Sequence, residues 1–348
     1  MDNKIKIYIL VFMMTPFISC GQSKVKKIET ESTFANEGDY NNLNHHILFA
    51  AIDINSVTKS INDVSIRIKD LKTGKESIIV SNLYLSSPAF GWIDSSHVFY
   101  ETSKSIGEPK VFGPWQGYLI KHNIYTQQKD TIPSFWHSSN NSVENFLTDN
   151  NKLFYTIVYG SEDLNYKYWK VYDFQTDRTH LIQKFNNNHS FRILTYQYLP
   201  ESNEIIYVKG NKDYTKYEFV QLSVSTGEEK TIKAISSDNS IMSSTIDGSN
   251  FYYLERITFE NLEGVTDLKN SNYVINSIDI NTGVIKQVHS FEKGIEVSKV
   301  DLYERGKLLV SIQGRIEENE VEKTFNLPEG GDITIGLNPV SYLYIIEI

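Results

Sequence analysis

A structural unit of about 50 residues recurs along this chain of 348 residues. Each copy contains a segment of three apolar or aromatic residues, which is typical of a buried β-strand. The six copies are Ile47–Phe49, Val98–Tyr100, Leu153–Tyr155, Ile205–Tyr207, Phe251–Tyr253 and Leu308–Val310. Self-similarity at such a period indicates a repeat architecture, because one unit cannot bury its own apolar face and needs its neighbours.

Each unit contains three further strand patterns. An apolar strand precedes the recurrent segment and is joined to it by a short polar turn, such as Asp247-Gly248-Ser249. A second strand follows, and in Val64–Leu71 it alternates between apolar and polar residues, which indicates a half-buried strand. In five units this strand ends in a turn that contains Thr and leads to a short outer strand, such as Glu76–Val80. Gly or Asp in these turns suits the positive φ of tight hairpins.

Six antiparallel units of four strands predict an all-β fold, a six-bladed β-propeller. A β-sandwich or two separate β-domains is the alternative. The sequence ends on the third strand of the sixth unit, so that this blade lacks an outer strand. We expect residues near 25 to 30 to supply it, and residues near 32 to 40 to form the inner strand of the first blade, because a propeller cannot leave an edge open.

The repeat resembles that of the TolB-like propeller family, in which an Asp-Gly-Lys-type turn is followed by an apolar strand and a strand ending in Asp-x-x-Thr-Gly. The stretches that carry the resemblance are Asp247-Gly248, Phe251–Tyr253 and Ile278–Gly283. The resemblance covers about residues 44–348. Pro88-Ala89-Phe90 departs from the family's Pro-x-Trp, and no copy has the complete Ser-Pro-Asp-Gly. The resemblance implies a fold and carries no function over.

The N-terminus has the layout of a secretory signal. Residues 1–6 contain two lysines, and residues 7–18 form an apolar run that is shorter than the roughly 20 residues of a membrane-spanning helix. Cys20 follows and is the only cysteine of the chain. The segment Phe17–Cys20 resembles a bacterial lipobox, in which the cysteine is acylated, although Phe17 replaces the usual Leu.

These features, together with the abundance of Asn, Lys and Ile, resemble lipoproteins of Bacteroidetes type. We expect a signal peptide over residues 1–19, a lipidated tether over 20–31 that partly closes the last blade, and one propeller domain over 32–348. The expected location is the cell envelope, at the periplasmic or surface side of the outer membrane. The lipid on Cys20 would be the membrane anchor.

The charge of the chain argues against one class of partner. It contains 43 acidic and 34 basic residues, which gives a formal net charge of −9. A protein that binds nucleic acid needs a basic surface to neutralise phosphates. We therefore expect no nucleic-acid partner.

The sequence contains no motif of a known catalytic or metal-binding centre. It has no Gly-x-Ser-x-Gly, no His-Glu-x-x-His and no pair of cysteines. The acidic stretch 317–322 lacks the spacing that places oxygen ligands around Ca²⁺, and we expect it to be a solvated loop. We predict no catalytic residue, no metal and no cofactor.

The connections between the second and third strands of the units are long, and in a propeller they lie on one face. They are Ser103–Gly117, Tyr159–Lys167, Arg256–Asn272 and Gln313–Val340. Long loops on one rim often bind partners, and aromatic and arginine side chains are frequent anchors. The candidate binding residues in these loops and in the connections between units are Trp115, Trp136, His137, Arg192, Arg256 and Arg315.

The favoured hypothesis is a non-catalytic binding or scaffold propeller that binds a protein or carbohydrate partner on this long-loop face. The alternative is a propeller enzyme, a lyase or glycosidase, that acts at the central channel. A sensor of extracellular carbohydrate or peptide is a third hypothesis. Two carboxylates or a histidine-metal site in the channel would favour the enzyme, and an aromatic groove without converging titratable groups would favour binding.

The lipid anchor gives a first testable prediction. Replacing Cys20 by Ala should leave a folded protein that no longer sediments with membranes, because the lipid and not the propeller holds it there. Membrane fractionation with metabolic lipid labelling measures this. A Cys20→Ala protein that stays in the membrane fraction would contradict the lipoprotein hypothesis.

Overall fold

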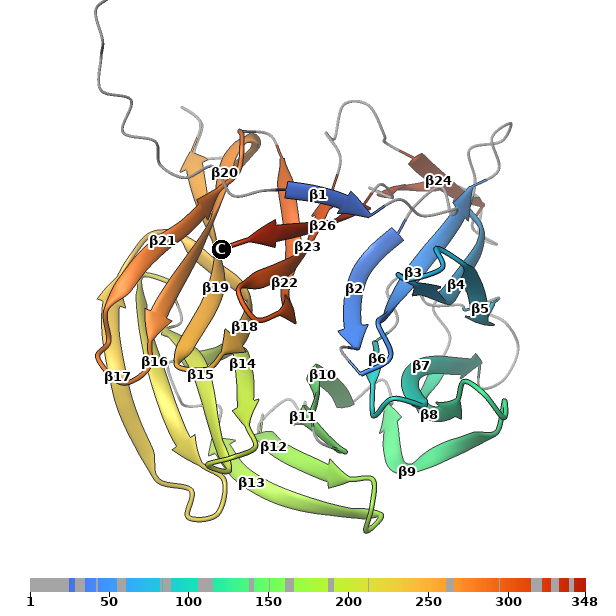
Figure 1. The fold of residues 1–348 in the computed structure, drawn as a ribbon, viewed down its shortest axis with the longest axis horizontal. Coiled ribbons are helices and arrows are strands. Elements are labelled where there is room, and N and C mark those ends of the chain that lie inside the picture. The colour runs from blue at the N-terminus through green and yellow to red at the C-terminus, as the bar shows by residue number, and fades with distance from the viewer. Residues whose placement is uncertain are drawn as a thin grey trace, which may run out of the picture.

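The computed structural model shows six four-stranded antiparallel sheets arranged around a central axis (Figure 1). The protein is therefore a six-bladed β-propeller, as predicted, and the β-sandwich alternative is wrong. The structure describes residues 25–28, 35–41, 43–54, 61–81, 83, 89–105, 115–137, 141–149, 151–159, 166–186, 191–211, 213–260, 266–293, 295–313, 321–326, 332–337 and 341–348. The proposed signal peptide and Cys20 lie outside these residues.

The blades follow one another along the chain. Blade one contains β2 (Ala35–Asn41), β3 (His46–Ile54), β4 (Ile61–Asp70) and β5 (Glu76–Val80). Blade two contains β6 (Phe90–Trp92), β7 (His97–Ser105), β8 (Trp115–Asn123) and β9 (Lys129–His137). Blade three contains β10 (Asn141–Asp149), β11 (Lys152–Tyr159), β12 (Tyr166–Asp173) and β13 (Arg178–Asn186).

The remaining blades keep this order, with one exception in blade six. Blade four contains β14 (Phe191–Leu199), β15 (Glu204–Asn211), β16 (Lys216–Ser223) and β17 (Glu229–Ser236). Blade five contains β18 (Ser240–Asp247), β19 (Asn250–Glu260), β20 (Thr266–Asp279) and β21 (Ile285–Ser290). Blade six contains β22 (Glu296–Glu304), β23 (Lys307–Gln313), β26 (Ser341–Glu347) and, as its outer strand, β1 (Val25–Ile28).

Apolar clusters lie between neighbouring blades and form the core. The recurrent aromatic segments supply both faces of each second strand. Leu48, for example, packs toward blade two, whereas Ile47 and Phe49 pack toward blade six. Because both faces are covered by a neighbouring blade, these segments are continuously apolar instead of alternating. This is the physical origin of the repeat in the sequence.

The predicted turns after the third strands are built on an acceptor side chain. The Asp279 carboxylate accepts hydrogen bonds from the backbone N–H groups of Asn281 at 3.0 Å and Thr282 at 2.8 Å. These bonds lower the pKa of Asp279. Gly283 then takes a φ of +69°, which glycine adopts without strain. Such turns fix the register of the outer strands.

The ring is closed by pairing of the two ends of the described chain, and this confirms the predicted closure. β1 runs antiparallel to β26, with Val25 opposite Ile346 and Ile28 opposite Leu343, and the two strands lie side by side in Figure 1. Ile28 is buried in the cluster between blades six and one. Tyr40 of β2 also meets Tyr303 of β22 across this seam, with ring centroids 4.3 Å apart.

Two of the predicted long loops contain strands. In blade five, β19 and β20 extend the hairpin beyond the body of the sheet, with Glu260 opposite Thr266. Between β23 and β26, the segments β24 (Val321–Asn326) and β25 (Asp332–Leu337) form a separate two-stranded sheet. The expectation of a loop throughout 313–340 is therefore wrong, because local pairing satisfies the backbone of this insertion. The described residues contain no helix with the length and hydropathy that crossing a membrane requires.

The closure gives a second prediction. Ile28→Ala should lower the free energy of unfolding by about 2 kcal/mol, because it removes buried apolar atoms from the seam between blades six and one. Lys26→Ala on the same strand is the control, since Lys26 is exposed and its truncation should cost little. Urea denaturation of both variants measures the difference. Equal unfolding midpoints would show that β1 does not stabilise the ring.

Candidate functional site

A cavity of about 600 Å³ lies at the centre of the ring, and the innermost strands of all six blades line it. Most lining residues come from the second half of their strands, which leads to the short turns. The lining polar and charged residues include Asp39, Thr148, Asp149, Thr195, Gln197, Ser243, Ser244, Thr245, Ser298, Lys299 and Asp301. The cavity is therefore closer to the short-turn face than to the long-loop face.

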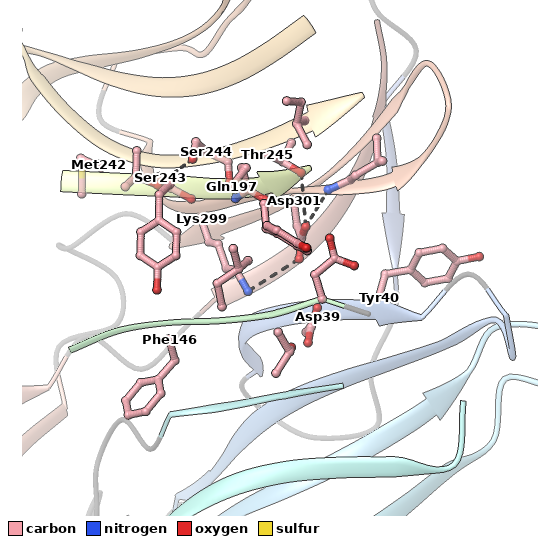
Figure 2. A pocket seen from close by; sticks show the side chains of 18 of the residues that line it. Asp39, Tyr40, Phe146, Gln197, Met242, Ser243, Ser244, Thr245, Lys299 and Asp301 are labelled. Atoms are coloured by element: carbon pink, nitrogen blue, oxygen red, sulfur yellow. Dashed lines mark hydrogen bonds and ion pairs between the residues drawn. The ribbon is translucent and has the colours of Figure 1, made fainter. Parts of the chain in front are cut away.

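Asp301 on β22 is the best-coordinated acid in the cavity. Its carboxylate accepts a hydrogen bond from the backbone N–H of Leu302 at 2.8 Å and one from the Thr245 hydroxyl at 3.5 Å. The Lys299 ammonium lies 3.7 Å from the other carboxylate oxygen. Figure 2 shows these three interactions converging on Asp301.

Asp39 on β2 faces Asp301 from blade one, across the seam where the ring closes. Its carboxylate accepts a hydrogen bond from the backbone N–H of Trp92 at 2.8 Å. Gly91 permits this approach, because an added Cβ would lie 3.1 Å from the same carboxylate oxygen and 2.6 Å from the Phe99 ring. The absence of a side chain at position 91 thus lets blades one and two meet closely beside the cavity.

The two acids are close enough to affect each other's protonation. Burial raises the pKa of the Asp39 carboxyl to about 7, the nearby Lys299 ammonium opposes that rise, and the negative charge of Asp301 adds to it. A hydrogen bond between the two carboxyl groups further favours the protonated form of Asp39. Near neutral pH the pair therefore shares one proton, which is the usual outcome for two adjacent carboxyl groups.

Aromatic side chains line the cavity on the blades away from this seam. Phe90 comes from blade two and Phe146 from blade three, which is opposite blade six in the ring. Phe146 is held by the buried Phe99 ring, whose centroid is 6.1 Å away. Blade four adds the phenol rings of Tyr196 and Tyr198. The cavity thus has the acid pair and Lys299 at the seam and most of its aromatic rings on the blades away from it, with Asp149 of blade three as a further carboxyl group.

The hydroxyl groups of the cavity wall are held by bonds between blades. Thr195 and Ser244 join blades four and five through a 2.7 Å hydrogen bond between their hydroxyl groups. The Gln197 amide donates to the Ser244 carbonyl at 2.7 Å. Ser243 bonds to the backbone of Val300 in blade six. This network fixes the positions of the polar groups and gives a preformed site.

The site has the chemistry for two tasks. A carboxyl group with a pKa near 7 can give or take a proton at neutral pH, which is the property of a general acid or base. The same pair can instead bind a hydroxyl or ammonium group of a ligand. Within the described part of the chain, no group of three or more His, Cys, Asp or Glu side chains is placed to hold a metal ion.

The predicted binding residues lie in strands where they were expected in connections. Trp115 is the first residue of β8, Trp136 and His137 end β9, and Arg192 is near the start of β14. In blade two, Trp136 pairs with Tyr118 and His137 with Gly117, so the three candidates of this blade share one end of the sheet. That end leads into the long connection between β7 and β8, and the binding role of these residues stays a prediction. Arg315 lies outside the described residues.

Arg256 is half-buried on β19. It hydrogen-bonds the Tyr273 phenol, and its charge partly offsets the rise in the pKa of Glu296 that burial causes. Its Nε is buried and makes no hydrogen bond with any described residue. Arg256 is therefore half-buried in blade five with its charge near Glu296 of blade six, and its role in binding stays a prediction.

The acid pair was not found from the sequence. Asp39 lies in a segment without an apolar pattern, and Asp301 lies in a strand that was assigned for its apolar residues. The sequence nevertheless contains a signal for channel residues, because the innermost strands of a propeller face its central axis. Charged residues inside these strands, such as Asp39, Lys299 and Asp301, are therefore candidates for the channel.

No family model and no curated protein matches the sequence. Similar solved structures include an oligogalacturonate lyase from Vibrio parahaemolyticus, with 12% identity, 95% of each chain covered and a TM-score of 0.49. Another is an oligogalacturonate lyase in complex with manganese, with 11% identity, a TM-score of 0.50, and 92% of this chain and 78% of that chain covered. A third is the calcium-binding protein regucalcin from Agrobacterium tumefaciens, with 9% identity, a TM-score of 0.49, and 83% and 86% covered. At these identities the likeness concerns the fold alone, a six-bladed β-propeller.

The acid pair gives a third prediction. The pKa of Asp39 is about 7 in the folded protein, whereas the ordinary pKa of an aspartic acid is 3.8, so the folded state holds an extra proton between these values. The stability of the wild type relative to Asp39→Asn should therefore fall as pH rises from about 4 to about 7. Urea denaturation at several pH values measures it, with Asp130→Asn on the exposed outer strand β9 as control. A difference that does not change with pH would contradict the pairing of the acids.

Proposed function

We propose that this protein is a non-catalytic, lipid-anchored binding propeller of the bacterial cell envelope. The cavity of about 600 Å³, lined by all six blades, carries this proposal. Its volume is within the range of small-molecule sites, and it combines a few fixed polar groups with aromatic rings. The wall is preformed by hydrogen bonds between blades, which reduces the entropy lost when a ligand is ordered.

A carbohydrate is the ligand class that this lining favours. Sugars offer hydroxyl groups to carboxylates, and the site offers Asp39 and Asp301 on its charged side. Sugars also present C–H faces that pack on aromatic rings, and Phe146 lies on the other side of the cavity. A protein partner fits the other end of the propeller better, where Trp115, Trp136 and His137 share the rim of blade two.

The proposed anchor would hold the propeller close to the membrane. Cys20 precedes the first residue of β1 by five residues, and an extended chain of that length spans about 18 Å at most. The outer edge of blade six would therefore be near the bilayer surface.

The second candidate function is a propeller enzyme of the lyase or glycosidase type, acting at the channel. The observations in its favour are the two carboxyl groups in the channel, the arrangement stated above to favour an enzyme, and the pKa of Asp39, which at about 7 suits proton transfer at neutral pH. A glycosidase, however, holds its two carboxyl groups at least about 5 Å apart, with the sugar between them. Asp39 and Asp301 are hydrogen-bonded to each other, which favours a binding role.

A channel-filling variant gives the fourth prediction. Met242 lines the cavity and is 37% exposed, so Met242→Trp can fill the channel without disturbing the core. We expect it to weaken binding of oligosaccharides at least tenfold in a native mass spectrometry screen of the detergent-solubilised full chain. Leu43→Trp is the control, because Leu43 is 74% exposed in the turn between β2 and β3.

The outcomes separate the two ends of the propeller and the two functions. If Met242→Trp keeps full binding and Trp115→Ala abolishes it, the site is at the long-loop end and the channel proposal is wrong. If the wild type shortens or modifies any bound oligosaccharide and Asp39→Asn does not, the protein is an enzyme. Binding without a change in ligand mass supports the proposal.

A further inference from the structure

The charges that line the channel do not balance. Three carboxyl groups, those of Asp39, Asp149 and Asp301, lie in the wall against one ammonium group, that of Lys299. This excess of negative charge lies in a confined cavity with an aromatic wall, where water screens charge poorly. A positively charged group on a ligand would therefore be attracted into the cavity.

The two acids of the pair differ in the hydrogen-bond donors and charges around their carboxyl groups. Asp301 has the Leu302 N–H, the Thr245 hydroxyl and the Lys299 ammonium around its carboxylate. Asp39 accepts a hydrogen bond from the backbone N–H of Trp92 and shares its proton with Asp301. The backbone bond engages one oxygen of Asp39, and the group still faces the cavity (Figure 2). When the shared proton leaves, a ligand donor can take its place.

The opposite wall suits the remainder of such a ligand. Phe146 on blade three lies across the cavity from blade six, and Phe90 lies beside it on blade two. Aromatic faces bind apolar groups and also attract cations through their quadrupole. A cation bound at the acid pair would therefore have an apolar group directed toward these rings.

We propose that the channel recognises a small ligand that carries a protonated amine next to an apolar face, with the ammonium group at Asp39 and Asp301 and the apolar face against Phe146. This inference rests on the proposed role of the channel as the ligand site. An amino sugar has this chemistry, as does any compact primary amine with a hydrophobic side.

The proton of the acid pair is exchanged in this binding step. The pKa of Asp39 is about 7, so this carboxyl is partly protonated at neutral pH. When an ammonium ion binds, the Asp39 carboxyl releases its proton to solvent and becomes a carboxylate, and the ligand supplies the positive charge in its place. Lys299 competes with the ligand for Asp301, and burial raises the pKa of the Tyr196 phenol on the far wall. The affinity for an ammonium ligand should therefore rise with pH through about 7.

Three probes of nearly equal shape test the charge preference. Benzylamine is the ammonium probe, benzyl alcohol is neutral and benzoate is anionic. Titration of the full chain at pH 6 and pH 8, followed by calorimetry, should give at least tenfold tighter binding for benzylamine than for benzyl alcohol, and no binding of benzoate. Affinities of fragments this small are expected to be weak, so millimolar probe concentrations are needed.

Variants locate the effect in the channel. Asp39→Asn should reduce the preference for benzylamine over benzyl alcohol to less than threefold and abolish the pH dependence, while Asp130→Asn on β9 should change neither. Asp301→Asn is the second channel variant. It should reduce the preference for benzylamine in the same way, and it replaces Asp39→Asn in the test if that variant unfolds. Thermal unfolding of each variant shows whether the ring is intact.

The outcomes also distinguish this inference from the proposed function. Benzyl alcohol bound as tightly as benzylamine, with both displaced by Met242→Trp, would keep the channel as a ligand site and overturn the ammonium preference. If none of the three probes binds, the inference fails as well, and if no oligosaccharide binds either, the proposed function fails with it. A tenfold preference that survives in Asp39→Asn would also overturn the assignment.

Discussion

The pairing of β1 with β26 is the interaction on which the rest of the molecule depends. A propeller holds together only if its last blade packs against its first, because each blade buries its faces against two neighbours. Here the N-terminal strand supplies the outer edge of blade six before the chain enters blade one. Ile28 and the Tyr40–Tyr303 contact then cover the seam. Closure thus pairs the edge of β26 and fixes the distance between the innermost strands.

Closure also creates the acid pair. Asp39 comes from the first blade and Asp301 from the last, and neither group would meet the other in an open chain. Bringing two carboxyl groups together in a buried place is unfavourable unless they share a proton or receive a cation. Once Asp39 loses its proton, above about pH 7, the ring holds a pair of charges that Lys299 alone does not neutralise. A ligand that completes the neutralisation is the simplest use of such an arrangement.

Much of this architecture could be predicted from the sequence. The recurrent apolar segments, such as those around Phe49 and Tyr207, predicted the six blades. The missing outer strand of the sixth unit predicted that the N-terminal strand closes the ring. The acid pair could not be predicted, since Asp39 and Asp301 lie at opposite ends of the chain and neither belongs to a motif. The hairpin of β24 and β25 was missed because its residues are largely polar and do not match the repeat. The rim candidates Trp115, Trp136 and His137 lie in strands where connections were expected, and their binding role stays a prediction.

The protonation of Asp39 is the quantity that tests this account most directly. Carboxyl carbon NMR of the full chain, with the Asp39 resonance assigned by comparison with Asp39→Asn, would follow its titration between pH 4 and pH 9. The account predicts an apparent pKa near 7 for the acid pair, and a shift to lower pH when a ligand amine is added. A single titration near pH 4 that is unaffected by Asp301→Asn would mean that the two carboxyl groups do not meet in the channel.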